Sequence, residues 1–270
     1  MTPTRLAERA DPASASAQRA RHLELVATEV AAGAAALVRA QQGQAIAAAT
    51  KSTPTDVVTH TDQESERHIR NALLQRAPGS TIVGEEYGDD EGANNVGWIV
   101  DPIDGTVNFL YDLPVVSVSI AATIDGEIVA GAVADIHRGD VYGAAVGAGA
   151  RCNGQAMVAS SARELGQALI GTGFAYDADL RAEQAVVLTR LLPAARDIRC
   201  MGSAALNLCW VGAGRLDAFF ERDLKIYDYA AGVVIAQEAG AIVSLPATRD
   251  DITLATAPRL EAALRAVLAD

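Results

Sequence analysis

The feature that most constrains the fold is an apolar run that leads directly into two aspartates. Residues 98–100 read Trp-Ile-Val, Asp101 follows them, and Asp104 stands three positions further on, just before Gly105. A short apolar run of this kind predicts a buried strand, and Pro102 predicts a turn directly after it. We therefore expect the strand to deliver Asp101 at its carboxyl end, with both carboxylates facing one crevice.

Two carboxylates in one crevice suit a hard divalent cation. Mg²⁺ prefers oxygen ligands, keeps several waters, and is usually held by a few carboxylates together with phosphate oxygens of a substrate. Asp101, Asp104 and the backbone carbonyl of Ile103 between them meet that requirement. The alternative is that either aspartate only caps the following turn, as Asp commonly does before Gly and Thr.

Three further acidic residues are candidates for ligands or for helix caps. Glu85 follows a short apolar strand, and ligands of open α/β sheets collect at that edge. Asp228 stands shortly before the predicted helical stretch 230–236, where it would serve either as an N-cap or as a metal ligand. Asp62 lies in the segment 61–64, spelled Thr-Asp-Gln-Glu, which predicts a capping box. A solvated or capping acid is the alternative for each of them.

The first half of the chain is predicted to form an α+β lobe. Residues 1–20 show no sustained period and are expected to be a disordered tail, whereas 23–38 repeats apolar residues at helical spacing. A second helix is expected from 61–64 to the Pro-Gly pair at 78–79, with an ordered loop or short hairpin over 51–59 before it. Strands are then expected as a meander over 81–83, 98–100, 115–124, 128–134 and 141–145.

Strands and helices alternate in the second half of the chain. The pattern predicts strands over 168–174, 198–201, 216–220 and 242–245, with helices around 181–192, from Ser203 and after Asp228. We place a soft domain boundary near residue 155. It separates an α+β metal-binding lobe over 21–155 from an α/β lobe over 156–270. No low-complexity linker separates the lobes, so we expect them to share a broad interface.

Composition excludes several classes of protein. The net charge of −12 argues against a basic nucleic-acid-binding surface, and the 50% of hydrophobic residues exclude a disordered chain. No apolar run approaches the ~18 residues that a membrane-spanning helix needs, so we expect a soluble cytoplasmic protein without a membrane partner. Cys152, Cys200 and Cys209 lack the paired spacing of a zinc site or a disulfide framework and are expected to be small buried residues.

Five segments of the chain carry motifs in a fixed order. The segments 51–62, 84–86, 98–109, 202–207 and 227–232 read KSTPTDVVTHTD, GEE, WIVDPIDGTVNF, GSAALN and YDYAAG. Together, and spread over roughly residues 25–245, they resemble the inositol monophosphatase family. The resemblance implies the fructose-1,6-bisphosphatase-like fold, a layered αβαβα sandwich of mixed α+β and α/β character in which two lobes pack intimately. It also implies a Mg²⁺-dependent, commonly lithium-sensitive and usually dimeric enzyme.

The resemblance implies a set of metal ligands. Glu85, Asp101 and the carbonyl of Ile103 would hold one Mg²⁺, and Asp101 would bridge it to a second ion held with Asp104 and Asp228. Two or three ions are expected in each active site.

The resemblance also implies catalytic and substrate contacts. Asp62 would orient the hydroxyl of Thr106, and Thr106 with Glu85 would position the attacking water. Amides of the Gly105–Thr106 turn would hold phosphate oxygens, and other residues would contact the hydroxyls of a polyol. The implied substrate-binding set is Asp104, Gly105, Thr106, Ala204, Glu221 and Asp228.

The implied reaction is the release of phosphate from inositol 1-phosphate by direct attack of a metal-activated water. The chain has neither a GxSxG elbow nor a Walker-type loop, which agrees with a route that needs no covalent phosphoenzyme. Histidinol phosphate, fructose 1,6-bisphosphate and 3′-phosphoadenosine phosphate are alternative substrates of the same chemistry. Some bacterial relatives associate with the transcription machinery, so a protein-interaction role is a lower-ranked alternative.

Three features depart from the family pattern. Tyr227 stands where many relatives have Trp, and Lys225 places a cation near the expected polyol pocket. The segment 238–246 runs into a short tail, which predicts a trimmed C-terminal lobe. These departures leave the preferred substrate open.

Overall fold

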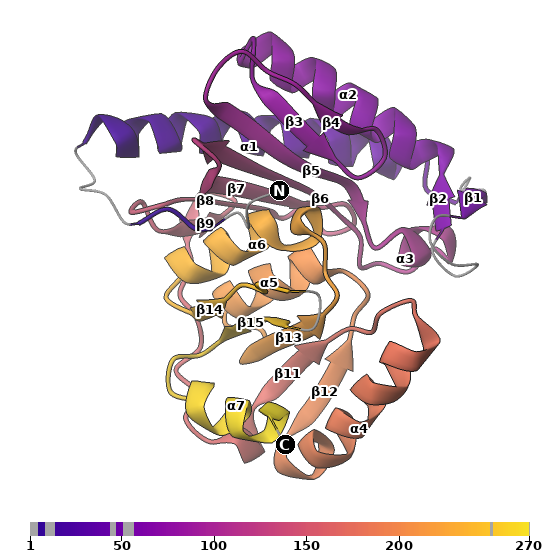
Figure 1. Ribbon diagram of the computed structural model, residues 1–270, viewed down its shortest axis with the longest axis vertical. Helices are drawn as coiled ribbons and strands as arrows, with labels where there is room; N and C mark the ends of the chain where they lie inside the picture. The colour runs from indigo at the N-terminus through magenta and orange to yellow at the C-terminus, as the bar shows by residue number, and fades with distance from the viewer. Residues whose placement is uncertain (1–4, 9–13, 44–46, 51–56, 249–250, 270) are drawn as a thin grey trace.

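Two sheets and the helices packed on them form five stacked layers (Figure 1). The computed structural model describes residues 5–8, 14–43, 47–50, 57–248 and 251–269. The layers are α1 (Ala15–Ala40) with α2 (His60–Arg76), an eight-stranded sheet, α5 (Ala204–Gly212) with α6 (Ile226–Glu238), a five-stranded sheet, and α4 (Ala178–Ala194) with α7 (Glu261–Ala269). The predicted layered αβαβα fold is confirmed. None of the described helices has the length and apolar character needed to span a bilayer.

The eight-stranded sheet is the meander expected from the sequence, extended at both edges. Its order is β10 (Gln155–Ala156), β9 (Ala150–Cys152), β8 (Val141–Ala145), β7 (Glu127–Asp135), β6 (Ser117–Ile124), β5 (Val96–Asp104), β3 (Thr81–Gly84) and β4 (Gly88–Asp90). Only β3 and β5 pair in parallel. All nine residues of β5 are buried, because helices cover both faces of the sheet at that point.

The five-stranded sheet contains one strand that the sequence did not predict, and an unpredicted helix follows that strand. Its order is β12 (Asp197–Cys200), β11 (Leu169–Thr172), β13 (Ala218–Arg222), β15 (Ile252–Thr256) and β14 (Ile242–Ser244). β15 inserts between β13 and β14, and α7 follows it against α4. The expectation of a trimmed C-terminal lobe is therefore wrong, since the last residues of the chain complete this sheet and cover its outer face.

The first helix begins inside the predicted tail. The hydroxyl of Ser14 accepts a hydrogen bond from the backbone amide of Ala17 at 3.1 Å and caps the helix. Residues 15–20 are helical, so the predicted tail boundary at residue 20 is wrong. Upstream of that cap, Leu6 forms a bridge to β7. Residues 1–4 and 9–13 of the predicted tail lie outside the described part of the chain.

The second helix begins two residues earlier than the predicted capping box implies. A strand, β2 (Val57–Thr59), runs directly into it and pairs with β1 (Ala47–Thr50), which confirms a short hairpin; residues 51–56 lie outside the described part. The cap is Thr59, and the box closes on Asp62, which accepts from the Thr59 amide at 2.8 Å. The predicted pairing of Thr61 with Glu64 is wrong.

At Gly131 of β7 the helix α6 packs closely against the eight-stranded sheet. A methyl group at this position would lie 2.7 Å from both the Cα and the carbonyl oxygen of Ala231. Backbone atoms cannot move aside as a flexible side chain can, so we expect Gly131→Ala to lower the free energy of unfolding by about 1–3 kcal/mol in urea denaturation. Gly166→Ala is the matched control, because its nearest neighbour would be at 3.7 Å. An unchanged unfolding midpoint for Gly131→Ala would contradict this packing.

Candidate active site

A cavity of about 630 Å³ gathers the predicted acidic residues from segments far apart in the sequence. Its walls come from the end of β3, from β5 and α3 (Thr106–Leu110), and from the segments that flank β12, β13 and the start of α6. The predicted site residues that line it are Glu85, Asp101, Ile103, Asp104, Gly105, Thr106, Ala204, Glu221 and Asp228. Asp62 lies behind this wall, in contact with Thr106.

Asp101 stands within a bulged strand, and Asp104 is the last residue of that strand. The turn predicted at Pro102 is wrong: β5 continues to Asp104, and its register with β6 shifts between the two aspartates. Proline has no amide to donate to a sheet and is tolerated at such a bulge. Asp101 accepts a hydrogen bond from the Ile103 amide at 3.0 Å, and both aspartates are buried. The bulge thus places both carboxylates on the same cavity.

Asp104 is tied to the N-terminus of α5. Its carboxylate accepts hydrogen bonds from the hydroxyls of Ser117, at 3.0 Å, and of Ser203, and from the amides of Ala204 at 3.1 Å and Ala205 at 2.9 Å. Burial raises the pKa of Asp104, while these hydrogen bonds lower it in part. Ala204, predicted only as a substrate contact, therefore also orients an acidic side chain.

The Thr106 hydroxyl lies between Asp62 and the backbone of β5. It is 3.1 Å from Asp62 Oδ1 and 3.0 Å from the carbonyl oxygen of Ile103. A hydroxyl has a single proton, so it donates fully to only one of these acceptors at a time. Asp62 is fully buried and is itself held by the Thr59 amide, so the predicted contact between Asp62 and Thr106 is present.

Asp228 occupies the first turn of α6 and is not its N-cap. The helix begins at Ile226, and the carboxylate of Asp228 accepts a hydrogen bond from the amide of Lys225. The amino group of Lys225 forms an ion pair with Asp223 at 2.9 Å. The cation expected near the polyol pocket does line the cavity, but its charge is partly offset by this partner.

Burial and like charges act together on the acids of the cavity. Burial raises the pKa of Asp101, and the negative charges of Glu85, Asp104 and Asp228 raise it further. Burial, followed by the charge of Glu85, raises the pKa of Asp228. For Glu221, burial and the charge of Asp104 raise the pKa to about 8. The cavity therefore concentrates negative charge that a cation would offset.

The donor chemistry fits a hard divalent cation. The carboxylates and the Ile103 carbonyl are the oxygen ligands that Mg²⁺ prefers, and their mutual repulsion is relieved by positive charge. Across the described ranges, no three His, Cys, Asp or Glu side chains close around one point as a complete protein cage would. Mg²⁺ does not require such a cage, because proteins usually hold it through one or two carboxylates together with waters and substrate phosphate oxygens.

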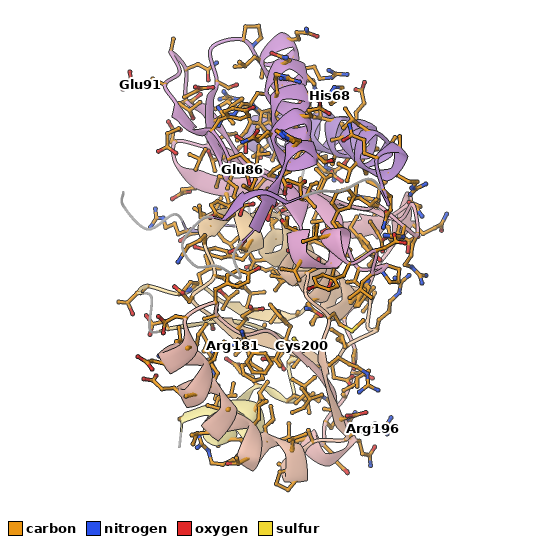
Figure 2. All side chains as sticks on the ribbon, turned by 90° about the vertical axis from the view of Figure 1, so that its right-hand side faces the viewer. His68, Glu86, Glu91, Arg181, Arg196 and Cys200 are labelled. Atoms are coloured by element: carbon orange, nitrogen blue, oxygen red, sulfur yellow. The ribbon has the colours of Figure 1, made fainter. Side chains whose placement is uncertain are left out.

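The second-lobe wall of the cavity contains residues that the sequence analysis did not assign. Figure 2 labels Arg181 on α4 and Cys200 at the end of β12, and both line the cavity. Cys200 is exposed and Cys152 half-buried, so the expectation of three buried cysteines holds only for Cys209. Ser117 and Ser203 were also missed, because a serine in a strand or before a helix carries no distinctive signal.

Comparisons with known proteins define the class of this fold and site. The model of the inositol monophosphatase family matches residues 20–269. The inositol-1-monophosphatase of Mycobacterium leprae is 44% identical over 264 residues, which cover 93% of this chain and 87% of that protein. The Nus factor SuhB of Escherichia coli K12 is 40% identical over 191 residues, or 70% of this chain and 72% of that protein. The solved structure of Mycobacterium tuberculosis SuhB superposes with a TM-score of 0.80 at 43% identity, covering 92% of this chain and 96% of that one.

Fold, cavity and relatives agree on an enzyme of the phosphatase class. The chain belongs to the inositol monophosphatase family.

Proposed function

We propose that the protein is a Mg²⁺-dependent phosphatase that releases phosphate from inositol 1-phosphate. The observation that carries the proposal is the convergence of Glu85, Asp101, Asp104 and Asp228 on one cavity with the buried acid Glu221. The likeness to a mycobacterial protein named inositol-1-monophosphatase supports this choice of substrate.

The proposed metal ligands are the acids that repel one another in the cavity. Glu85, Asp101 and the Ile103 carbonyl would hold one Mg²⁺, and Asp101, Asp104 and Asp228 would hold another, with two or three ions in all. When bound, Mg²⁺ supplies positive charge to the phosphoryl oxygens and lowers the pKa of a coordinated water.

The residues around Thr106 would orient the water and the phosphate. When the Thr106 hydroxyl donates its hydrogen bond to Asp62, the hydroxyl oxygen can accept a hydrogen bond from the attacking water. Glu85 would take up the proton of that water as a general base. The amides of Gly105 and Thr106 would hold phosphate oxygens, at a turn where Gly105 has φ 97° and an added methyl would lie 2.9 Å from the Val115 carbonyl oxygen.

Glu221 is proposed to recognise the hydroxyls of the polyol, together with the wall around Ala204. We expect Glu221→Gln to raise KM for inositol 1-phosphate roughly tenfold while leaving hydrolysis of p-nitrophenyl phosphate within a few-fold, because the latter has no hydroxyl for the carboxylate to bind. Initial-rate measurements on both substrates test this selectivity. An equal loss on both would remove Glu221 from substrate recognition and assign it a structural role.

A panel of phosphomonoesters tests the substrate assignment. Phosphate release from inositol 1-phosphate, histidinol phosphate, fructose 1,6-bisphosphate and 3′-phosphoadenosine phosphate is compared at fixed Mg²⁺, with and without lithium. We expect the highest kcat/KM for inositol 1-phosphate and inhibition by lithium. A tenfold preference for any other member of the panel would overturn the inositol assignment while leaving the phosphatase class intact.

A second, non-catalytic role is favoured by the 40% identity to the Escherichia coli protein named Nus factor SuhB. In this role the chain would contact proteins of the transcription machinery. A pull-down from cell extract with the Asp104→Asn protein tests it, since this variant separates binding from turnover. Recovery of no transcription protein would count against the role.

The assembly proposed for the enzyme itself is a cytoplasmic homodimer. Light scattering of the purified protein checks the dimer.

A further inference from the structure

One face of α2 carries three buried polar side chains that reach three different segments of the active site. Asp62, Ser65 and Glu66 stand at i, i+3 and i+4, so they lie on the same side of the helix, and all three are fully buried. Asp62 reaches Thr106, as described above. Ser65 and Glu66 have no part in the proposed chemistry. A buried polar group is costly unless it is hydrogen-bonded, so their partners indicate what they do.

Glu66 holds the loop that carries Glu85. Its carboxylate accepts hydrogen bonds from the backbone amide of Glu86 at 2.7 Å and from that of Tyr87 at 3.2 Å, the two amides directly after Glu85. Figure 2 labels Glu86 on this loop. The Glu66 carboxylate also accepts from Arg70 Nε at 2.8 Å. Both carboxylate oxygens are therefore engaged, and the loop cannot shift without breaking buried, charge-assisted hydrogen bonds.

The far side of the same loop is fixed as well. Arg70 donates to the carboxylate of Asp90 and to the carbonyl of Gly88, both on β4. Gly84, the residue before Glu85, leaves the space for this arrangement, since a methyl group there would lie 2.0 Å from Glu66 Oε1. The Glu66 carboxylate is buried and hydrogen-bonded through both oxygens, so it could not rotate away from such a methyl group.

Ser65 holds the bulge of β5. Its hydroxyl donates to the carbonyl oxygen of Pro102 at 3.1 Å, in the stretch where the strand changes register. The Pro102 carbonyl belongs to the peptide unit that joins Pro102 to Ile103, so this hydrogen bond restrains the backbone directly before the Ile103 carbonyl. The Ile103 carbonyl itself accepts a hydrogen bond from the Thr106 hydroxyl at 3.0 Å. Ser65 thus restrains the backbone next to an oxygen that the proposed site uses as a ligand.

We propose that Ser65 and Glu66 are positioning residues that set two metal ligands, the Ile103 carbonyl and Glu85, from one face of α2. The inference rests on the proposed function, and it adds that the geometry of the metal site is fixed by a helix that does not itself line the cavity. Groups that orient metal ligands in this way typically change metal affinity or activity by about 10–100-fold when they are replaced.

Calorimetric titration of the metal-free protein with Mg²⁺ alone tests the proposal. Glu66→Gln keeps the size of the side chain but turns one acceptor into a donor facing an N–H group. We expect its Kd for Mg²⁺ to rise about 10–100-fold, with kcat recovering to within a few-fold at saturating Mg²⁺. Glu64→Gln is the matched control, because Glu64 is exposed on the same helix and its carboxylate accepts a hydrogen bond from Gln41 Nε2 at 2.8 Å. Its Kd should not change.

Ser65→Ala keeps the test decisive if Glu66→Gln does not fold. It removes one hydroxyl and adds no bulk, and we expect a several-fold rise in Kd at a melting temperature close to that of the wild type. If Glu66→Gln folds and its Kd for Mg²⁺ equals that of the wild type, the positioning role is overturned. If Glu66→Gln does not fold, an unchanged Kd in Ser65→Ala overturns it. Absence of Mg²⁺-dependent phosphatase activity in the wild-type protein would instead overturn the proposed function, so the two failures are distinguishable.

Discussion

Replacement of Asp101 by Asn is expected to lower kcat/KM for inositol 1-phosphate by about 10³-fold or more. This loss corresponds to about 4 kcal/mol of transition-state stabilisation. Asp101 is buried on the bulge of β5, within the electrostatic reach of Glu85, Asp104 and Asp228, and it is the acid proposed to serve two metal ions. An amide keeps the shape of the side chain but withdraws the charge that both ions would share. Initial rates at several Mg²⁺ concentrations measure the effect.

The same substitution is expected to stabilise the metal-free protein at neutral pH. Burial and the surrounding acids raise the pKa of Asp101, so its ionised form opposes folding and a neutral amide does not. Asp125→Asn is the matched control: it makes the same chemical change in the exposed β6–β7 turn, where Asn tolerates the positive φ of 53°. Asp101→Asn with near wild-type turnover, or with a lower metal-free melting temperature, would contradict the assigned role.

Removal of metal is expected to make the folding stability fall as the pH rises from about 4 to about 8. The pKa values of Asp101, Asp228 and Glu221 are raised above their ordinary values, first by burial and then by neighbouring acids. A raised pKa contributes stability below the unfolded-state pKa and loses it as the pH rises through the folded-state pKa, which for Glu221 is about 8. The slope is on the order of 1 kcal/mol per pH unit for each such group.

Mg²⁺ is expected to cancel most of this pH dependence, because it binds the ionised carboxylates of the folded state and not those of the unfolded chain. Melting curves of the metal-free protein at pH 5 and pH 8, each repeated with Mg²⁺, measure it. The largest rise in melting temperature should occur at pH 8. Sodium chloride at matched ionic strength controls for screening. An equal Mg²⁺-induced rise in melting temperature at both pH values would show that Mg²⁺ does not bind these carboxylates.

Much of the site follows from the sequence because its acids stand beside strong local signals. The apolar run before Asp101 and the short strand before Glu85 predict a strand leading into each acid, and ligands gather where such strands end. The order of five motifs predicts the layered fold, which the structure and the relatives confirm. The ion that these acids bind and the substrate of the site stay predictions.

The remaining features depend on tertiary contacts that leave no local trace. Pro102 predicts a turn, but the burial of β5 on both faces makes a bulge within the strand the better solution. Glu66 looks like any helical acid until the fold places two loop amides against it. The helix boundaries at Ser14 and Thr59 were missed because several Ser and Thr residues compete as caps, and the contacts of the first turn decide among them.

The most direct test is phosphate release from inositol 1-phosphate by the purified, metal-free protein before and after addition of Mg²⁺. We predict no measurable turnover without the ion, turnover that saturates with Mg²⁺, and turnover lower by about 10³-fold or more in the Asp101→Asn protein under the same conditions. Equal phosphate release with and without Mg²⁺, or turnover near the wild-type rate in Asp101→Asn, would contradict the proposal that this carboxylate cavity is a metal-dependent phosphatase site.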